Sequence, residues 1–250
     1  VQGEQPTHPQ LLDWLALNFI ESGWDIKGFQ KLIVMSATYK QSSRVDPDKL
    51  AIDSQNRLLA RGPRFRLDAE VIRDQVLSVS GLLIGKIGGM SVKPYQPEGL
   101  WDDIVERVQE NRLSTGDDLY RRSLYTFWKR TRPAPSMITF DSSTRETHIV
   151  TPTRTNTPLQ ALNLMNDVTY VEAARALGER VMRKGLAEKL SVEQNVNHMY
   201  RLAVARQPTE EVRSILVGAY DDYLSEYQID RQAALDLVSE GESLRDETLD

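Results

Sequence analysis

The polar run at residues 140–148 holds the side chains that could most readily do chemistry. Asp141, Arg145, Glu146 and His148 bring carboxylates, a guanidinium and an imidazole into one short stretch. A carboxylate beside a histidine can act as a general acid–base pair. The same side chains can instead form a polar network that holds a loop in place, because buried polar groups need hydrogen-bond partners. The pattern favours this structural interpretation, and the acid–base pair is the alternative.

A second polar stretch directly precedes an expected helix. Thr157 and Pro158 are typical of a helix start, with a capping hydroxyl followed by a first-turn proline. The residues just before them could complete an anion-binding corner at the helix N-terminus or serve as an elaborate cap, and the pattern favours the cap. No catalytic residue is predicted. The candidate ligand-binding residues of the two stretches are Asp141, Arg145, Glu146, His148, Arg154 and Asn156.

Arginines gather in two parts of the chain. Between residues 57 and 74 they interleave with acidic residues, a pattern typical of ion pairs, with a phosphate or sulfate site as the alternative. Residues 121–154 hold 7 basic and 2 acidic residues, whereas residues 191–250 hold 5 basic and 13 acidic ones. The net charge of −5 argues against nucleic acid as the partner. We expect the basic stretch to face acidic groups of the same protein, and an external anionic partner is the alternative.

Several familiar catalytic and metal-binding patterns are absent from the sequence. It has no cysteine, which excludes disulfides, thiolate metal ligands and covalent haem attachment within this segment. The histidines His8, His148 and His198 are too scattered to predict a metal site. Neither a phosphate-binding glycine-rich loop nor a Gly-x-Ser-x-Gly motif occurs. The sequence predicts no metal and no cofactor in this segment, and it leaves open whether the chain is an enzyme.

Helices must position these polar stretches. Thr7 with Gln10 and Ser191 with Gln194 fit capping boxes. Further helical segments are predicted at residues 56–60 and 120–129, and the helix that begins at Asp68 is predicted to run to residues 88–89. Capping residues followed by apolar residues at helical spacing predict helix starts near Pro9, Asp25, Asp46, Asp68, Thr157, Asp167, Ser191, Thr209 and Asp230.

The pattern as a whole indicates an all-α protein. No segment sustains the alternation of a β-strand, and no apolar run reaches the roughly 18 residues that a membrane span needs. We expect an irregular multi-helix fold with long polar connecting loops. The predicted parts are a first helical lobe at residues 1–112, a basic, loop-rich connector at 113–156 and a second helical lobe at 157–250.

Five motifs, in this order along the chain, resemble those of a known family. They are residues 32–42 (LIVMSATYKQS), 93–101 (KPYQPEGLW), 121–130 (RRSLYTFWKR), 140–141 (FD) and 154–162 (RTNTPLQAL). Together they are similar to the C-terminal domain of unknown function of large planctomycete-type multidomain proteins. The resemblance covers most of the chain, and the last motif is its most specific part.

The resemblance implies a setting for the chain. It implies a fragment truncated at both ends, from a parent protein of the cell envelope or periplasm that often carries a planctomycete cytochrome c module upstream. Any haem c would belong to that module. The family offers no established catalytic residue to transfer. We therefore expect a helical accessory or interaction module, linked to redox or polysaccharide metabolism, whose partners are other domains of the same polypeptide. The alternative is an enzyme or ligand-binding domain acting on an anionic or carbohydrate substrate.

Overall fold

The computed structural model describes residues 5–97, 113–129, 133–146, 148–149 and 152–249. The chain divides into two compact units, Val1–Phe65 and Arg66–Asp250. This division falls inside the predicted first lobe, and the predicted connector at residues 113–156 belongs to the second unit. The end of the motif at residues 93–101 and the position of Arg130 lie outside the described residues.

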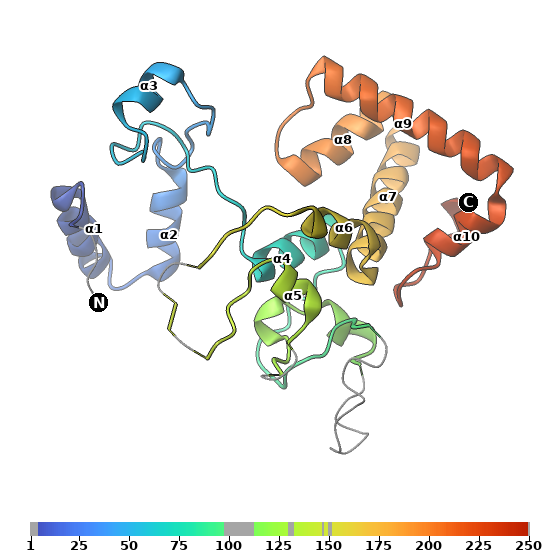
Figure 1. Cartoon of the computed structure of the whole chain (residues 1–250), viewed down its shortest axis with the longest axis horizontal. Helices are drawn as coiled ribbons and strands as arrows, with labels where there is room; N and C mark the ends of the chain where they lie inside the picture. The colour runs from blue at the N-terminus through green and yellow to red at the C-terminus, as the bar shows by residue number, and fades with distance from the viewer. Residues whose placement is uncertain (1–4, 98–112, 130–132, 147, 150–151, 250) are drawn as a thin grey trace. The chain divides into compact units, whose positions relative to one another are not determined.

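The first unit holds α1 (Pro9–Glu21), α2 (Ile26–Met35) and α3 (Pro47–Ile52), shown in blue in Figure 1. As predicted, Asp25 caps α2 by accepting from the N–H of Gly28 at 3.0 Å. The predicted capping box of Thr7 and Gln10 is wrong. His8 is the N-cap of α1, and the Thr7 hydroxyl is instead hydrogen-bonded to the His8 ring at 2.8 Å.

The helical prediction for residues 56–60 is also wrong. The Asp53 carboxylate accepts from the N–H groups of Arg57 and Leu58, at 2.8 and 2.7 Å. Asn56 and Leu59 both have a φ of 56°. A left-handed residue interrupts a right-handed helix, so this segment forms turns.

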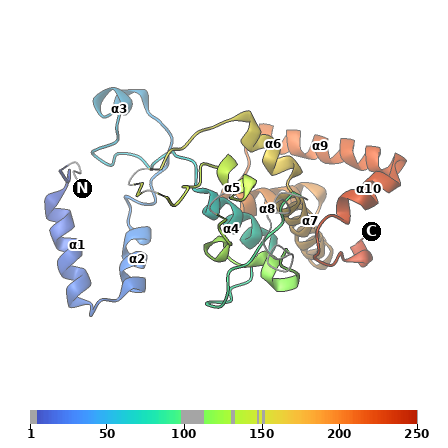
Figure 2. The same ribbon diagram turned by 60° about the horizontal axis from the view of Figure 1, so that its bottom comes forward.

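The second unit is built around the long helix α7 (Val168–Glu188). It packs against α4 (Ala69–Ser80), α6 (Pro158–Asn166), α8 (Val192–Val204) and α10 (Arg231–Val238). The short α5 (Pro135–Thr139) contacts α4 and α6, and α9 (Glu210–Ile229) contacts α8 and α10. Figures 1 and 2 show these helices within the second unit. The second unit also contains short 3-10 helices at Gly116–Tyr120, Ser123–Tyr125 and Glu247–Leu249.

The caps of the C-terminal helices are confirmed. Asp167 accepts from the N–H of Thr169 at 2.9 Å, and Ser191 and Gln194 form the predicted capping box of α8. Thr209 caps α9 and Asp230 caps α10 in the same way. These signals lie within a few residues of the helix that they start, which is why the sequence reveals them.

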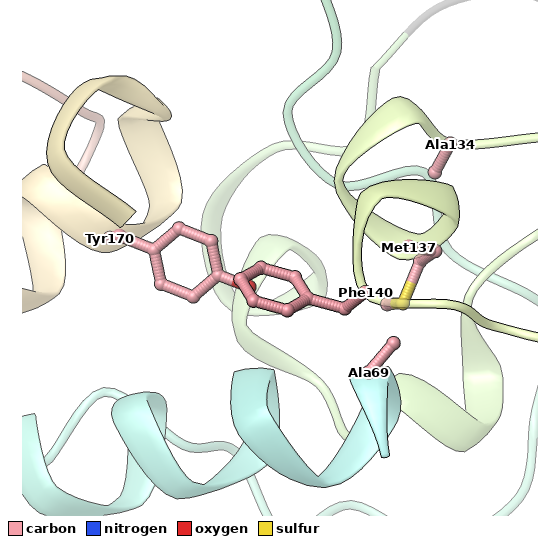
Figure 3. Close-up of a cluster of buried hydrophobic side chains, with 5 residues drawn as sticks. All are labelled: Ala69, Ala134, Met137, Phe140 and Tyr170. Carbon is pink, nitrogen blue, oxygen red and sulfur yellow. The ribbon is translucent and has the colours of Figure 1, made fainter. Parts of the chain in front are cut away.

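The buried core of the second unit falls into two clusters. In the first, the rings of Phe140 and Tyr170 meet edge to face, with centroids 6.3 Å apart, above Ala69 at the start of α4 (Figure 3). Ala134 and Met137 of the α5 region complete it. The second cluster consists of Leu77, Leu119 and Tyr120. The α5 segment and residues 119–120 are thus packed onto α4.

Helix α4 ends earlier than predicted. It stops at Ser80, because Gly81 adopts a left-handed φ of 91° and its N–H reaches back to Leu77 O at 3.1 Å. Residues 82–89 therefore leave the helix. Residues 88–89, the predicted end, are two further left-handed glycines in a loop.

The predicted helix at residues 120–129 is wrong. Apart from Tyr120, which ends one short 3-10 helix, and the 3-10 helix Ser123–Tyr125, this segment is not helical and lies beside residues 84–92. Ile84 N donates to Tyr120 O at 3.0 Å, and Phe127 N donates to Val92 O at 2.7 Å. Main-chain bonds to a distant segment replace the helix.

The all-α prediction is confirmed for the described residues. They contain isolated bridges but no strand or sheet. No helix among them is both long and apolar enough to cross a bilayer.

Candidate functional site

Asp141 lies at the centre of the predicted polar site. Its carboxylate accepts from Arg66 Nη2 at 2.5 Å and from the N–H of Thr155 at 2.7 Å. The Thr155 hydroxyl donates to it as well, at 2.9 Å. The backbone N–H of Thr155 is the main reason why the pKa of Asp141 lies below its usual range, and Arg66 adds to the effect. Asp141 is therefore an ion-paired acceptor rather than a proton donor.

Arg66 and Gln160 extend this network to neighbouring carbonyls. Arg66 donates to Thr155 O at 3.0 Å and to Phe140 O at 3.1 Å. The side chain of Gln160 is buried and donates to Thr139 O at 2.9 Å and to the Thr155 hydroxyl at 3.1 Å. The network ties the end of α5 to the start of α6 and to Arg66, three residues before α4. Its geometry is that of a brace between three elements.

The two predicted arginines are paired with acidic residues near the start of α4. Arg145 lies 3.6 Å from Glu70 and 4.8 Å from the centre of the Trp128 ring. Arg154 lies 3.4 Å from Asp68. Both pairs are partly exposed, so each contributes at most about 1 kcal/mol to stability.

The other predicted residues are exposed. Glu146, His148 and Asn156 all have exposed side chains. The hydrogen bonds of the Asp141 carboxylate among the described residues go to Arg66 and Thr155 and not to the His148 imidazole. Of the six candidates, Asp141 is a member of the network, and Thr155 joins that network to the segment that holds Arg154 and Asn156. No group of three or more potential metal ligands occurs within the described part of the chain.

A second network, which the sequence did not reveal, surrounds the buried guanidinium of Arg73. This residue is 3% exposed and donates to the carbonyls of Leu119 and Arg121, at 2.6 and 2.8 Å. Its Nη1 also lies 3.2 Å from the Ser123 hydroxyl, and Asp74 accepts from the N–H of Ser123 at 2.7 Å. Burial lowers the pKa of Arg73, although a guanidinium stays charged in proteins.

Arg121 is buried in the same way within the basic stretch. Its guanidinium donates to the carbonyls of Lys86, Gly88 and Met90. The same group lies 4.0 Å from the centre of the Tyr125 ring, whose hydroxyl accepts from the N–H of Gly88 at 2.8 Å. Arg121 therefore satisfies the carbonyls of the loop that follows α4, and this part of the basic stretch faces inward.

A third network binds the residues after α10 to α7. The carboxylate of Glu172, which is 1% exposed, accepts from the Tyr120 hydroxyl and from the N–H of Ser243, each at 2.7 Å. Gly241 has a φ of 88°, and its backbone lies close to the Glu172 side chain. A Cβ added at Gly241 would lie 2.2 Å from Cδ of Glu172. Burial raises the pKa of Tyr120, and the hydrogen bond to Glu172 raises it further. The phenol therefore stays protonated and donates.

Cavities lie elsewhere in the second unit. One of about 260 Å³ is mostly apolar and lies among α4, α6, α7 and Ala203 of α8. Another of about 270 Å³ lies among residues 95–97, α5, α6 and Asp167. Neither is lined by any of the six predicted residues. The predicted polar site and the cavities of these helices are separate features.

Comparison with known proteins gives a family for the chain. A family model described as a protein of unknown function (DUF1553) matches residues 1–220. No curated protein and no solved structure matches the chain.

Proposed function

The chain belongs to the family of proteins of unknown function (DUF1553), and we propose that it is a helical accessory module that docks onto another domain of the same polypeptide. The observation that carries this proposal is the large apolar surface of the first unit. Leu12, Trp14 and Leu17 on α1 are 55, 51 and 58% exposed. Trp24, between α1 and α2, and Ile26, the first residue of α2, are 65 and 63% exposed.

The first unit has almost no interior to stabilise it. Gly62 is the only buried residue among the described residues of this unit. Phe19 contacts Trp24 and Phe29, in each case with ring centroids 5.1 Å apart. Full burial of a large apolar side chain stabilises a protein by about 1.5–3 kcal/mol. A docking partner that covers these side chains would supply the apolar burial that the first unit lacks.

The composition of α1 favours a protein partner over a membrane surface. Helices that lie on anionic membranes are rich in Lys and Arg, whereas α1 carries Asp13 and Glu21 and neither basic residue type. A domain of the same polypeptide also has the advantage of a tether. A tether raises the effective concentration of the partner, so a modest apolar surface suffices for stable docking.

The alternative, an enzyme or ligand-binding domain acting through Asp141 and its neighbours, has weaker support. Asp141 is occupied by Arg66 and Thr155, and Arg145 and Arg154 are ion-paired. A cell-envelope or periplasmic location, an upstream haem c module and a link to redox or polysaccharide metabolism also belong to this proposal. They rest on the resemblance of the sequence motifs, and the domain content and cellular fraction of the parent protein test them.

Cross-linking of the parent polypeptide tests the docking. Lys27 and Lys31 are exposed on α2. We expect both to cross-link to a second domain of the same polypeptide, and we expect Leu12→Glu to abolish these cross-links without changing the circular dichroism spectrum. Leu186→Glu is the matched control, because Leu186 is a leucine on α7 with 68% exposure. Unchanged cross-links in Leu12→Glu would overturn the proposal.

A further inference from the structure

The cavity of about 270 Å³ among residues 95–97, α5 and α6 contains polar groups that none of the networks above uses. Its volume is slightly below the range of about 300–1,000 Å³ that is usual for small-molecule sites. It therefore has room for one small ring rather than for a chain of them. Its polar lining residues are Tyr95, Gln96, Ser136, Asn163, Asn166 and Asp167, and proline and leucine side chains complete it.

Two amide atoms at this cavity are buried without a partner. Gln96 Oε1 and Asn163 Nδ2 have no hydrogen-bond partner within the described part of the chain. A buried polar atom left unpaired destabilises a protein by about 1–3 kcal/mol, so such atoms are rare and indicate a missing hydrogen-bond partner. The terminal torsion of an amide side chain is broad and twofold, so rotation can turn either atom towards the cavity.

The two amides require complementary partners. Gln96 Oε1 needs a donor, and Asn163 Nδ2 needs an acceptor. A hydroxyl group is both, because its O–H donates while its lone pairs accept. Asn166 and the Ser136 hydroxyl add further donors and acceptors around the same space. The lining thus matches a molecule with several hydroxyl groups.

The charge of the lining excludes an anion as the preferred ligand. Among the described residues that line this cavity there is no lysine or arginine, and the charged one is Asp167. That carboxylate is held by the N–H of Thr169 at 2.9 Å, at the start of α7. A negative group inside the cavity would face the Asp167 carboxylate, and none of the described lining residues is a cation that could bind it directly.

An aromatic ring at the cavity is fixed in place. The Tyr95 hydroxyl accepts from the N–H of Glu242 at 2.7 Å, which anchors the far end of the side chain. Its ring and the neighbouring prolines and leucines offer an apolar surface. Sugars and cyclic polyols present C–H faces beside their hydroxyls. We propose that this cavity binds one neutral, hydroxyl-rich ring, a monosaccharide or cyclic polyol.

Side-chain amide signals test this proposal directly. In ¹H–¹⁵N spectra of the whole chain, titration with D-glucose or myo-inositol should shift the side-chain NH₂ signals of Gln96 and Asn163. Inorganic phosphate should not shift them. Gln96→Met and Asn163→Leu should each weaken the binding of the responsive probe at least tenfold, and each should leave the melting temperature unchanged or raise it because an unpaired buried atom is removed.

Matched variants keep the test decisive. Gln30→Met makes the same chemical change as Gln96→Met on the exposed surface of α2 and should not alter binding. If Asn163→Leu fails to fold, Asn163→Asp removes the same donor at constant size. The proposal is overturned if neither probe shifts the two signals, which would mean that water alone fills the cavity. It is also overturned if phosphate shifts them instead, or if both amide variants bind like the original protein. None of these outcomes bears on the docking of the first unit.

Discussion

Arg73 donates a hydrogen bond from Nη1 to the main-chain carbonyl of Arg121 at 2.8 Å, so one buried arginine holds the backbone of another. Arg121 in turn donates to three carbonyls of the loop after α4. The two guanidiniums thereby connect α4, residues 84–92 and residues 119–125. This chain of contacts organises the middle of the second unit in place of a longer helix.

Replacing Arg73 by methionine should destabilise the second unit by about 3 kcal/mol. The substitution leaves the carbonyls of Leu119 and Arg121 buried without their donor, and hydrogen bonds to charged groups contribute about 1.5–3 kcal/mol each. Urea unfolding measures the change. Arg122→Met is the control, since its ion pair with Asp74 is 56% exposed on the arginine side and should contribute less than about 1 kcal/mol. Equal losses in the two variants would contradict the role given to Arg73.

Asp141→Asn should lower stability at neutral pH by about 1 kcal/mol, because the ion pair with Arg66 is lost. The pKa of Asp141 is lower in the folded state than its unfolded value of about 3.9. Its contribution is therefore complete above the unfolded pKa and disappears as the pH falls through the folded one. Unfolding free energies of the two proteins, measured between neutral and strongly acidic pH, should converge on the acid side. A difference that is constant with pH would contradict the ionised pair.

Gly81→Ala should destabilise the chain by about 1–2 kcal/mol, because Gly81 has a φ of 91° and an L-residue pays a steric penalty in that region. Beyond Gly81 and its two chain neighbours, no atom of the described residues lies within 4 Å of the position of the added Cβ, so the effect isolates backbone conformation. Gly85→Ala is the matched control. A Cβ added at Gly85 also points into open space, and the φ of Gly85 is not left-handed. The Gly85→Ala substitution should therefore not destabilise the chain. Thermal melts of the two variants compare them.

Tyr120→Phe should lower the free energy of unfolding by about 1–3 kcal/mol, since it removes the hydroxyl that donates to the buried Glu172 carboxylate. The loss should be much smaller in a Glu172→Gln background, because the charged acceptor is then absent. A double-mutant cycle by urea unfolding gives the coupling energy, which we expect to exceed about 1 kcal/mol. A coupling energy near zero would show that the 2.7 Å contact contributes little.

The candidate site was predictable only in part. The polar character of residues 140–156 and its bracing role were visible in the sequence, and Asp141 does lie at the centre of a network. Its partners Arg66 and Gln160 were not proposed as members of that network. Arg66 is 75 residues away from Asp141, and nothing local distinguishes it from the other arginines between residues 57 and 74. The cap predicted at Thr157 is confirmed, because Gln160 Oε1 accepts from the N–H of Thr157 at 3.3 Å. The hydrogen bonds of Gln160 to Thr139 and Thr155 were not predicted.

The sequence by itself determined the all-α class and most helix starts, because a cap such as Asp167 with Thr169 joins neighbours in the chain. Tertiary structure alone decided that residues 120–129 are mostly non-helical. The reason is that Arg73 and Arg121 bind main-chain carbonyls, a group that every residue carries. The sequence shows that an arginine is present, whereas only the folded chain determines which distant carbonyls accept its hydrogen bonds.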